Sequence, residues 1–528
     1  MNTPIRTKLF LTIVGVTRPA LVLVGVLSYL GGKATVERTT LEHLTSVRAQ
    51  KARQIEGYFD LIQTQARAMA QDRTVIEAMI DFDIAFQELE TVEVTREQQE
   101  AVASYYSDEF LPRLEAHTDS RIEPTNLLPA ANAELYLQRE YIVANPSPVG
   151  EKYLLDDPGD GSDYSVVHGV VHPFLRDFAR QFGYHDLMLI SGDGRAVYTV
   201  EKEVDLGTDL IDGPYRDSNL AKVFSEVQRD FSDGRVRVVD FAQYAPSFGE
   251  PAAFVAAPIV GADRLLGALV LQMPIGEIDR VMTDDQEWLS QGLGTTGETY
   301  LVGPDSRLRS NSRFFLEDPE SYFAQLEKAG ATEIDLRRIR TFDTSILLQE
   351  VDSRAVREAL DGLTATTITT DYRGEEVLSS FEPLDLQDLD WVVLAERDAS
   401  DAFASIRKLA RNTVHAGAIL ALVVLILSWV AARRFVEPIL ELEEAASRFA
   451  GGDQSIRLEV RSEDELGRLT GTFNRMIESI RRQTAELTRN NEELQGVKSV
   501  ILRWGPDGVI RFINDFGCAH FGFSAAEL

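Results

Sequence analysis

The 528-residue chain has one cysteine, Cys518, so its fold cannot depend on an intramolecular disulfide framework. Basic residues are also scarce: 53 lysines and arginines stand against 84 aspartates and glutamates, a formal net charge of -31. A surface of this sign repels nucleic acid, which excludes it as an expected partner. There is no glycine-rich phosphate cradle, and after residue 432 the only histidine is His520. We therefore expect no catalytic residue, metal or cofactor within this sequence.

Long apolar runs are confined to two segments. Residues 9–30 are almost continuously apolar behind the basic residues Arg6 and Lys8, and they are long enough to cross a hydrocarbon core of about 30 Å. Residues 414–432, VHAGAILALVVLILSWVAA, end against Arg433 and Arg434. We predict two transmembrane helices. A cleaved signal peptide is the alternative for the first run, but no small-x-small cleavage pattern follows it.

The basic residues that flank these runs predict the topology. They precede the first run and follow the second, so the positive-inside rule places both termini in the cytoplasm. Residues 1–8 are then a cytoplasmic N-terminus, and residues 31–413 form one large region outside. The protein is predicted to be a multi-pass protein of the plasma (inner) membrane.

The outside region combines a long helix with two β-rich stretches. Residues 36–79 have helical periodicity without proline. Short strands punctuated by Gly, Pro and Asp then occur twice, at about 145–280 and about 290–400, each with a hairpin closed by a Gly-Asp-Gly or Gly-Pro-Asp turn. The pattern predicts an α+β membrane protein, in which two antiparallel sheet modules stack on one helix.

This region resembles the double Cache sensor, a PAS-like module of many bacterial receptors. The resemblance rests on NPSPVGEKYLLDDPGDGSDYSVVH from residue 145, DGPYRDSNL from residue 212 and GTTGETYLVGPDSRLRSNSRF from residue 294. It implies that an extracytoplasmic small molecule is sensed, most often in the membrane-distal module. The Arg, Trp-Tyr, Tyr and Asp pattern of the amino-acid-binding version is not found here.

Three groups of residues in this region are candidate ligand-binding positions. His168 and His172 are spaced i, i+4, which would put both imidazoles on one helix face, although no third metal ligand is near in the sequence. Tyr215, Arg216 and Asp217 offer a donor, a cation and an acceptor on one loop. Arg309 could bind a carboxylate with two hydrogen bonds. The alternatives are structural histidines, a plain turn and a solvated ion pair.

Apolar residues at 3-4 spacing follow the second apolar run. They form two stripes separated by the pair Gly451-Gly452 and a polar connector, and neither stripe can be buried by one helix alone. A parallel four-helix bundle made by a homodimer is therefore predicted. The residues predicted to transmit the signal are Pro438, Ile439, Leu442, Ala446, Phe449, Glu465, Leu466, Gly467, Leu469, Phe473, Met476 and Ile480.

The proline after the membrane and the motif DELGRLTGTFNRM resemble a HAMP domain over residues 433–483. This family implies that a small movement of the membrane helices is converted into a repacked bundle. Heptad spacing continues through residues 484–501 as a signalling coiled coil. The turn Pro506-Asp507-Gly508 and the aromatic residues after it resemble the start of a PAS domain, at 502–528. A whole PAS domain needs about 100 residues, so we expect an incomplete domain.

These features predict a transmembrane signal transducer that passes ligand binding to an output module beyond residue 528. A sensor histidine kinase of a two-component system and an adenylate or guanylate cyclase are the alternatives for that module. A chemoreceptor is a further alternative, which the break at WGPDG (504–508) disfavours because such receptors continue as a long helix.

Overall fold

The computed structural model describes residues 5–118, 126–262, 264–524 and 527. It divides into two compact units, residues 32–407 and a second unit made of residues 1–31 with 408–528. The predicted segments 1–8 and 502–528 lie partly outside the described residues. Each unit is described separately below.

Helix α1 (Ile5–Ala70) runs for 66 residues and contributes to both units. The chain leaves the helix at Gln71, and α2 (Arg73–Leu89) begins under an N-cap in which Asp72 accepts a hydrogen bond from the Thr74 backbone N–H (2.8 Å). The uninterrupted helix predicted over 36–79 is therefore two helices. Its apolar stripe is as expected, since Ile55 and Ile62 are buried.

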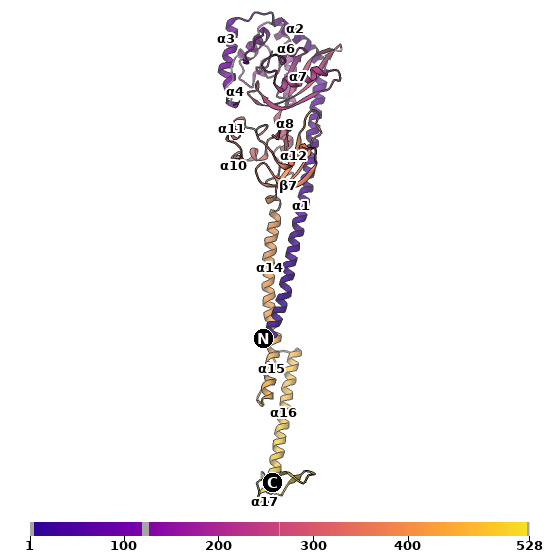
Figure 1. The fold of residues 1–528 in the computed structure, drawn as a ribbon, viewed down its shortest axis with the longest axis vertical. Coiled ribbons are helices and arrows are strands. Elements are labelled where there is room, and N and C mark those ends of the chain that lie inside the picture. The colour runs from indigo at the N-terminus through magenta and orange to yellow at the C-terminus, as the bar shows by residue number, and fades with distance from the viewer. Residues whose placement is uncertain (1–4, 119–125, 263, 525–526, 528) are drawn as a thin grey trace. The chain divides into compact units, whose positions relative to one another are not determined.

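The remaining helices of the unit 32–407 surround two sheets (Figure 1). They are α3 (Arg96–Tyr105), η1 (Tyr106–Phe110), α4 (Leu111–Thr118), α5 (Asn132–Gln138), η3 (Arg139–Val143), η4 (Lys152–Leu154), α6 (Asp163–Gln181), α7 (Asn219–Arg229), α8 (Ile275–Thr283), α9 (Arg313–Glu317), α10 (Pro319–Ala329), α11 (Glu333–Phe342), α12 (Arg354–Leu360) and α13 (Ala399–Ala402).

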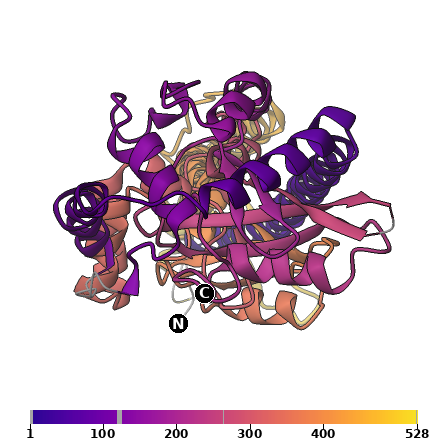
Figure 2. The same ribbon diagram turned by 90° about the horizontal axis from the view of Figure 1, so that it is seen from above.

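The first sheet, which we call the distal sheet, is antiparallel and has the order β2-β1-β5-β4-β3. Its strands are β1 (Asp186–Ser191), β2 (Ala196–Thr199), β3 (Arg237–Tyr244), β4 (Glu250–Gly261) and β5 (Arg264–Gln272). One face packs on residues of α1, α2 and α6, and the other packs on α7. Figure 2 shows the strands between these two layers of helix.

The second sheet, which we call the proximal sheet, is also antiparallel and has the order β6-β9-β8-β7. Its strands are β6 (Glu298–Val302), β7 (Ala365–Thr370), β8 (Glu376–Pro383) and β9 (Val392–Asp398). The mixed helix and sheet architecture with antiparallel sheets, which the sequence predicts, is thus confirmed.

Trp391 joins the two sheets. Its ring meets Phe59 of α1 edge to face (5.4 Å between centroids) and stacks on Phe241 of the distal sheet (5.9 Å). All three side chains belong to one hydrophobic cluster. The two sheets and α1 therefore share one hydrophobic core, and the unit 32–407 does not consist of two independent domains.

The unit that contains residues 408–528 is mostly helical. It holds α14 (Ala404–Ala431), η5 (Ala432–Val436), α15 (Glu437–Ala450), α16 (Glu465–Gly496), the hairpin β10 (Leu502–Trp504) and β11 (Ile510–Ile513), and α17 (Asp515–Phe521). Two helical stretches, Phe10–Ala70 and Ala399–Ala450, are long and apolar enough to cross a membrane. Helix α16 ends at Gly496, five residues before the predicted end of the coiled coil at 501.

Candidate functional site

A cavity of about 220 Å³ opens beside the distal sheet. Its walls come from the end of α3, the loop after β2 and the turn between β3 and β4. The wall carries charges of both signs, on Lys152, Arg180, His185, Glu201, Lys202, Glu203 and Glu250. Its volume lies below the 300 to 1,000 Å³ typical of drug-sized ligands, so it suits a compact polar molecule.

Two buried carboxyl groups lie behind the wall of this cavity, next to its lining residues Glu201 and Val204. Asp186 accepts hydrogen bonds through Oδ1 from the backbone N–H groups of Val200 (2.8 Å) and Glu201 (3.1 Å). Asp205 accepts one through Oδ2 from the Tyr244 hydroxyl (2.5 Å). Both aspartates are fully buried, and Glu201 belongs to the cavity wall.

The second oxygen of each aspartate lacks a donor. Among the described residues, Oδ2 of Asp186, Oδ1 of Asp205 and Oε1 of Gln272 have no hydrogen-bond partner. Gln272 lies directly opposite Asp186 in the pairing of β1 with β5. Buried acceptors without donors are costly, so this place favours a group that brings several N–H donors or a positive charge.

Burial raises the pKa of Asp205 to about 7 and that of Asp186 well above its ordinary value. The nearby Asp205 carboxyl raises the pKa of Asp186 further. A proton on Asp205 therefore competes near neutral pH with any cation that binds beside it.

The two predicted histidines form a stacked, buried pair on α6, with ring centroids 4.3 Å apart. Nδ1 of His168 donates to the Asp156 carbonyl (2.7 Å), and Nε2 of His172 donates to the Tyr153 carbonyl (2.7 Å), because a carbonyl can only accept. Nε2 of His168 has no partner among the described residues. Burial and the neighbouring Lys202 keep both rings neutral, whereas the hydrogen bonds to the two carbonyls act in the opposite direction. Burial places their pKa values far below the ordinary range, at about 2 for His172.

Lys202 connects the histidine pair to the cavity. Its Nζ lies 3.4 Å from Nδ1 of His172, donates to the Val200 carbonyl (3.2 Å) and sits over the Tyr198 ring. Burial lowers the pKa of Lys202 to about 7. Lys202 also lines the cavity, so a change in its charge would alter the electrostatic potential at both the histidine pair and the cavity.

The loop residues Tyr215, Arg216 and Asp217 do not act together. Tyr215 is buried in the cluster around α3, whereas Arg216 and Asp217 are exposed and 3.8 Å apart. Burial raises the pKa of Tyr215 well above its ordinary value. Of these three residues, only Tyr215 lies in the interior beside Asp205, which contributes to that pKa shift.

Arg309 lies between the two sheets rather than in a cavity. Its guanidinium donates to both carboxylate oxygens of Asp240 on β3 (2.8 and 2.9 Å) and pairs with Asp305 (2.9 Å). Nε1 of Trp391 also donates to Asp240 (3.0 Å). Because its donors are occupied within the protein, Arg309 stabilises the contact between the sheets and is not available to a ligand in this state.

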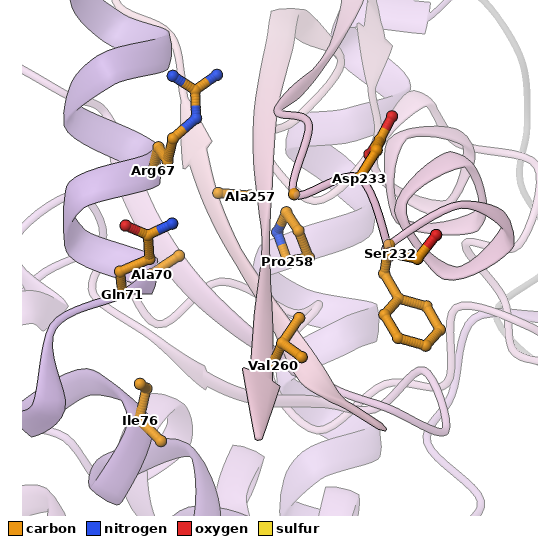
Figure 3. Close-up of a pocket in the computed structure, with 11 residues that line it drawn as sticks. Arg67, Ala70, Gln71, Ile76, Ser232, Asp233, Ala257, Pro258 and Val260 are labelled. Carbon is orange, nitrogen blue, oxygen red and sulfur yellow. The ribbon is translucent and has the colours of Figure 1, made fainter. Parts of the chain in front are cut away.

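A second hollow of about 460 Å³ lies where β4 extends past β3, between α1 and the loop after α7 (Figure 3). Arg67 of α1 and Gln71, which directly follows α1, face Ser232 and Asp233 of a loop, with Pro258 of β4 between them. Strand β3 begins at Arg237, opposite Ala256, so β4 continues past it along this hollow. The hollow is an open groove without a buried polar group, and we do not include it in the candidate site.

The residues predicted to transmit the signal all lie on α15 and α16. Ile439, Leu469 and Met476 are 43%, 55% and 45% exposed in the single chain. Ala445 and Ile477, which the pattern does not single out, are buried instead. The chain's own helices therefore cover the predicted stripe only in part, since other members of it are half-buried: Leu442, Phe449, Leu466, Phe473 and Ile480.

The connector between these helices is fixed by Asn474 and Arg461. The Asn474 side chain accepts from the Leu458 N–H (3.0 Å) and donates to the Leu458 carbonyl (2.8 Å). Arg461 pairs with Glu441 on α15 (3.0 Å). Asp464 caps α16 by accepting from the N–H groups of Leu466 and Gly467.

Residues 430–482 match the family described as HAMP domain, so the predicted HAMP segment is confirmed. The chemotaxis protein PctB of Pseudomonas aeruginosa is 27% identical over 135 residues, 25% of this chain and 22% of that protein. The sensor histidine kinase MtrB of Mycobacterium tuberculosis is 40% identical over 80 residues, 15% of this chain and 14% of that protein. The chain thus aligns with less than a quarter of either relative.

Similar solved structures include the sensory domain of the Campylobacter jejuni chemoreceptor Tlp3, at a TM-score of 0.34 and 11% identity, covering 70% of this chain and 98% of that one. The sensor domain of the V. cholerae histidine kinase DctB gives 0.27 and 13%, covering 57% and 98%. At these TM-scores the likeness says nothing about a ligand.

Proposed function

We propose that this chain is the sensing and transmitting part of a homodimeric membrane signal transducer. The observation that carries the proposal is the HAMP segment at 430–482, which follows directly on the apolar helix α14. The sheet-containing unit 32–407 lies along the chain between the two apolar runs, 9–30 and 414–432. In this proposal both stretches cross the inner membrane, the sheet-containing unit is outside and both termini are cytoplasmic.

The outside unit is proposed to be a double Cache sensor, with modules at about 145–280 and about 290–400. Two antiparallel sheets joined through a common core support this assignment. The hairpin β10–β11 followed by α17 supports a PAS start at 502–528. Asn514 supports it further by fixing the entry to the hairpin: its side chain donates to the carbonyls of Val497 and Ser499 (3.0 Å each).

The ligand is proposed to be a compact molecule with an ammonium or similar donor-rich group, bound in the cavity beside the distal sheet. The three acceptor oxygens without donors, on Asp186, Asp205 and Gln272, support this class. The cavity volume of about 220 Å³ limits the size. In this proposal the histidine pair acts on the cavity through Lys202, which lies beside His172. Tyr215 acts on it through Asp205.

The first test is a thermal-shift screen of the full chain in nanodiscs against small amines, carboxylates and uncharged analogues. A ligand at 100 times its dissociation constant should add about 2.7 kcal/mol to stability. We expect amines to raise the melting temperature. They should bind more tightly at pH 8 than at pH 6, because Asp205 loses its proton near pH 7. Asp205→Asn should weaken this pH dependence and leave the part that Lys202 causes, because Lys202 loses its own positive charge near pH 7 at the cavity wall. A response to carboxylates alone would contradict the proposed ligand class.

A second test addresses the homodimer. Met476→Cys in a Cys518→Ser background is expected to form an inter-chain disulfide, since Met476 is exposed on the predicted seam. Adding Phe473→Asp should abolish this cross-link, because a charge would be buried in the bundle at a cost of several kcal/mol. Thr472→Asp, at an exposed position, is the matched control. Equal cross-linking in both variants would contradict the four-helix bundle.

The output is proposed to lie in a cytoplasmic module that follows the HAMP segment, with a histidine kinase or a nucleotide cyclase ahead of a chemoreceptor. The observation that favours this order is the end of α16 at Gly496. A hairpin begins six residues later, at Leu502, where a chemoreceptor would continue as a helix.

A further inference from the structure

Two buried glutamates face each other in the proximal sheet. Glu298 on β6 and Glu396 on β9 are direct partners in the antiparallel pairing. They are 1% and 2% exposed. Side chains in such positions have Cβ atoms about 5 Å apart on the same face of the sheet. Two like charges at this distance inside a protein are strongly unfavourable, so both carboxyl groups cannot be ionised at ordinary cost.

The hydrogen-bond partners of the pair are hydroxyl groups. Glu298 accepts from Tyr372 (2.8 Å) and Ser312 (3.1 Å), and Glu396 accepts through Oε2 from Tyr300 (2.8 Å). Oε1 of Glu396 has no partner within the described ranges. Hydroxyl groups do not neutralise a carboxylate, and the free oxygen is a place where a proton can reside.

The nearest guanidinium is engaged elsewhere. Arg373 donates through Nε to Asp371 (2.7 Å) and through Nη2 to Asp398 (2.6 Å). The guanidinium that acts on Glu298 is therefore already paired with two other carboxylates, those of Asp371 and Asp398. The titratable and charged groups packed around the pair are Tyr300 of β6, Asp398 of β9, Asp371, Tyr372 and Arg373 of the β7–β8 turn, Tyr322 of α10, and Glu382 of β8 with Arg48 of α1.

We propose that Glu298 and Glu396 form a proton-binding site, and that loss of its proton loosens β9 at the point where the chain enters α13 and α14. Strand β9 ends at Asp398 and α13 begins at Ala399, so Glu396 lies a few residues before the helix that carries the second apolar stretch. The site makes the proximal sheet responsive to external pH. It does not depend on the ligand cavity of the distal sheet.

The pKa values agree with this geometry. Burial raises the pKa of Glu298 to about 7 and that of Glu396 to about 8, from an ordinary value of 4.5. An acid whose folded pKa is raised keeps its proton while the unfolded chain has lost it. Sheet stability is therefore full below about pH 4.5 and declines as the pH rises toward the folded pKa values.

The test is hydrogen exchange of residues 392–402 in the full chain in nanodiscs between pH 5 and 7, corrected for intrinsic exchange rates. We expect the opening constant to rise with pH, by up to about tenfold per pH unit for each proton released. Glu298→Gln and Glu396→Gln each remove one titrating carboxyl group, so each should reduce the rise of the opening constant by about tenfold per pH unit. Glu376→Gln, at an exposed position on β8, is the control and should leave the slope unchanged.

Infrared difference spectra of the same samples provide a second readout, which needs no opening of the sheet. A carbonyl band of a protonated carboxyl group should disappear between pH 6 and pH 9 in the wild type, and each single glutamine variant should lower its amplitude. An unchanged band in both variants, or an exchange slope equal to that of the wild type, would overturn the proposal. Both readouts are independent of any small ligand.

Discussion

Asp240→Ala is expected to lower the free energy of unfolding of the unit 32–407 by about 3 kcal/mol, because it removes one partner of a buried ion pair. The Arg309 guanidinium, with a side chain only 2% exposed, would keep Asp305 but lose both hydrogen bonds to Asp240. Nε1 of Trp391 would lose its acceptor as well. Urea titration of the variant against the wild type measures the loss.

Two further variants make this result specific. Asp390→Ala removes an exposed carboxylate close in sequence to Trp391 and should change stability by less than about 0.5 kcal/mol. The double variant Asp240→Leu with Arg309→Met should recover part of the loss, since an apolar pair of similar volume needs no desolvated charge, while Nε1 of Trp391 still lacks its acceptor. Equal losses for Asp240→Ala and Asp390→Ala would show that the ion pair does not hold the sheets together.

His168→Phe is expected to flatten the acid side of the stability profile. The folded pKa values of His168 and His172 lie far below 6.5, whereas the unfolded chain takes up these protons near pH 6.5. Above pH 6.5 the pair contributes no pH dependence. Below it, each histidine lowers the free energy of unfolding by about 1.4 kcal/mol per pH unit. Between pH 6.5 and 4.5 the free energy of unfolding of His168→Phe should therefore decline less steeply than that of the wild type, by about 1.4 kcal/mol per pH unit.

The comparison with wild type isolates the histidine contribution. The raised pKa of Asp205 acts in the opposite direction, because that carboxyl binds its proton in the folded state first, but it is present in both proteins. At pH 7.5 the variant should be only about 1 kcal/mol less stable, for the lost bond to the Asp156 carbonyl. His43→Gln, at an exposed position, is the control. Identical slopes in wild type and His168→Phe would mean that His168 already carries a proton.

Local patterns predicted the elements well. The hairpin turns at Gly192-Asp193-Gly194 and Gly303-Pro304-Asp305 lie where the sequence puts them, because turn chemistry is set by neighbouring residues. The HAMP segment was equally readable from its spacing and motif, whereas the residues of its seam remain a prediction. The break at Asp72 was missed, since a cap inside a long periodic stretch differs from an ordinary surface aspartate only by its backbone conformation.

The candidate site was less predictable. The i, i+4 spacing of His168 and His172 placed them on one helix face, but their partners are carbonyls of a loop before α6, which spacing cannot reveal. Asp186 had a readable signal, an acidic residue opening the apolar strand DLMLIS that is buried throughout. Arg309 and Asp240 are far apart in the sequence, so their pairing follows from how the two sheets pack and from no local pattern.

Pro258 has a consequence for how the protein avoids self-association. Strand β4 runs past the start of β3 along the hollow of Figure 3, which leaves a length of strand without a neighbour on that side. Proline is tolerated in a strand where its nitrogen faces away from a neighbouring strand, and it cannot donate to an incoming one. A free strand edge can otherwise recruit strands of other chains. Pro258 thus offers no backbone donor to a strand that would approach this edge of the sheet.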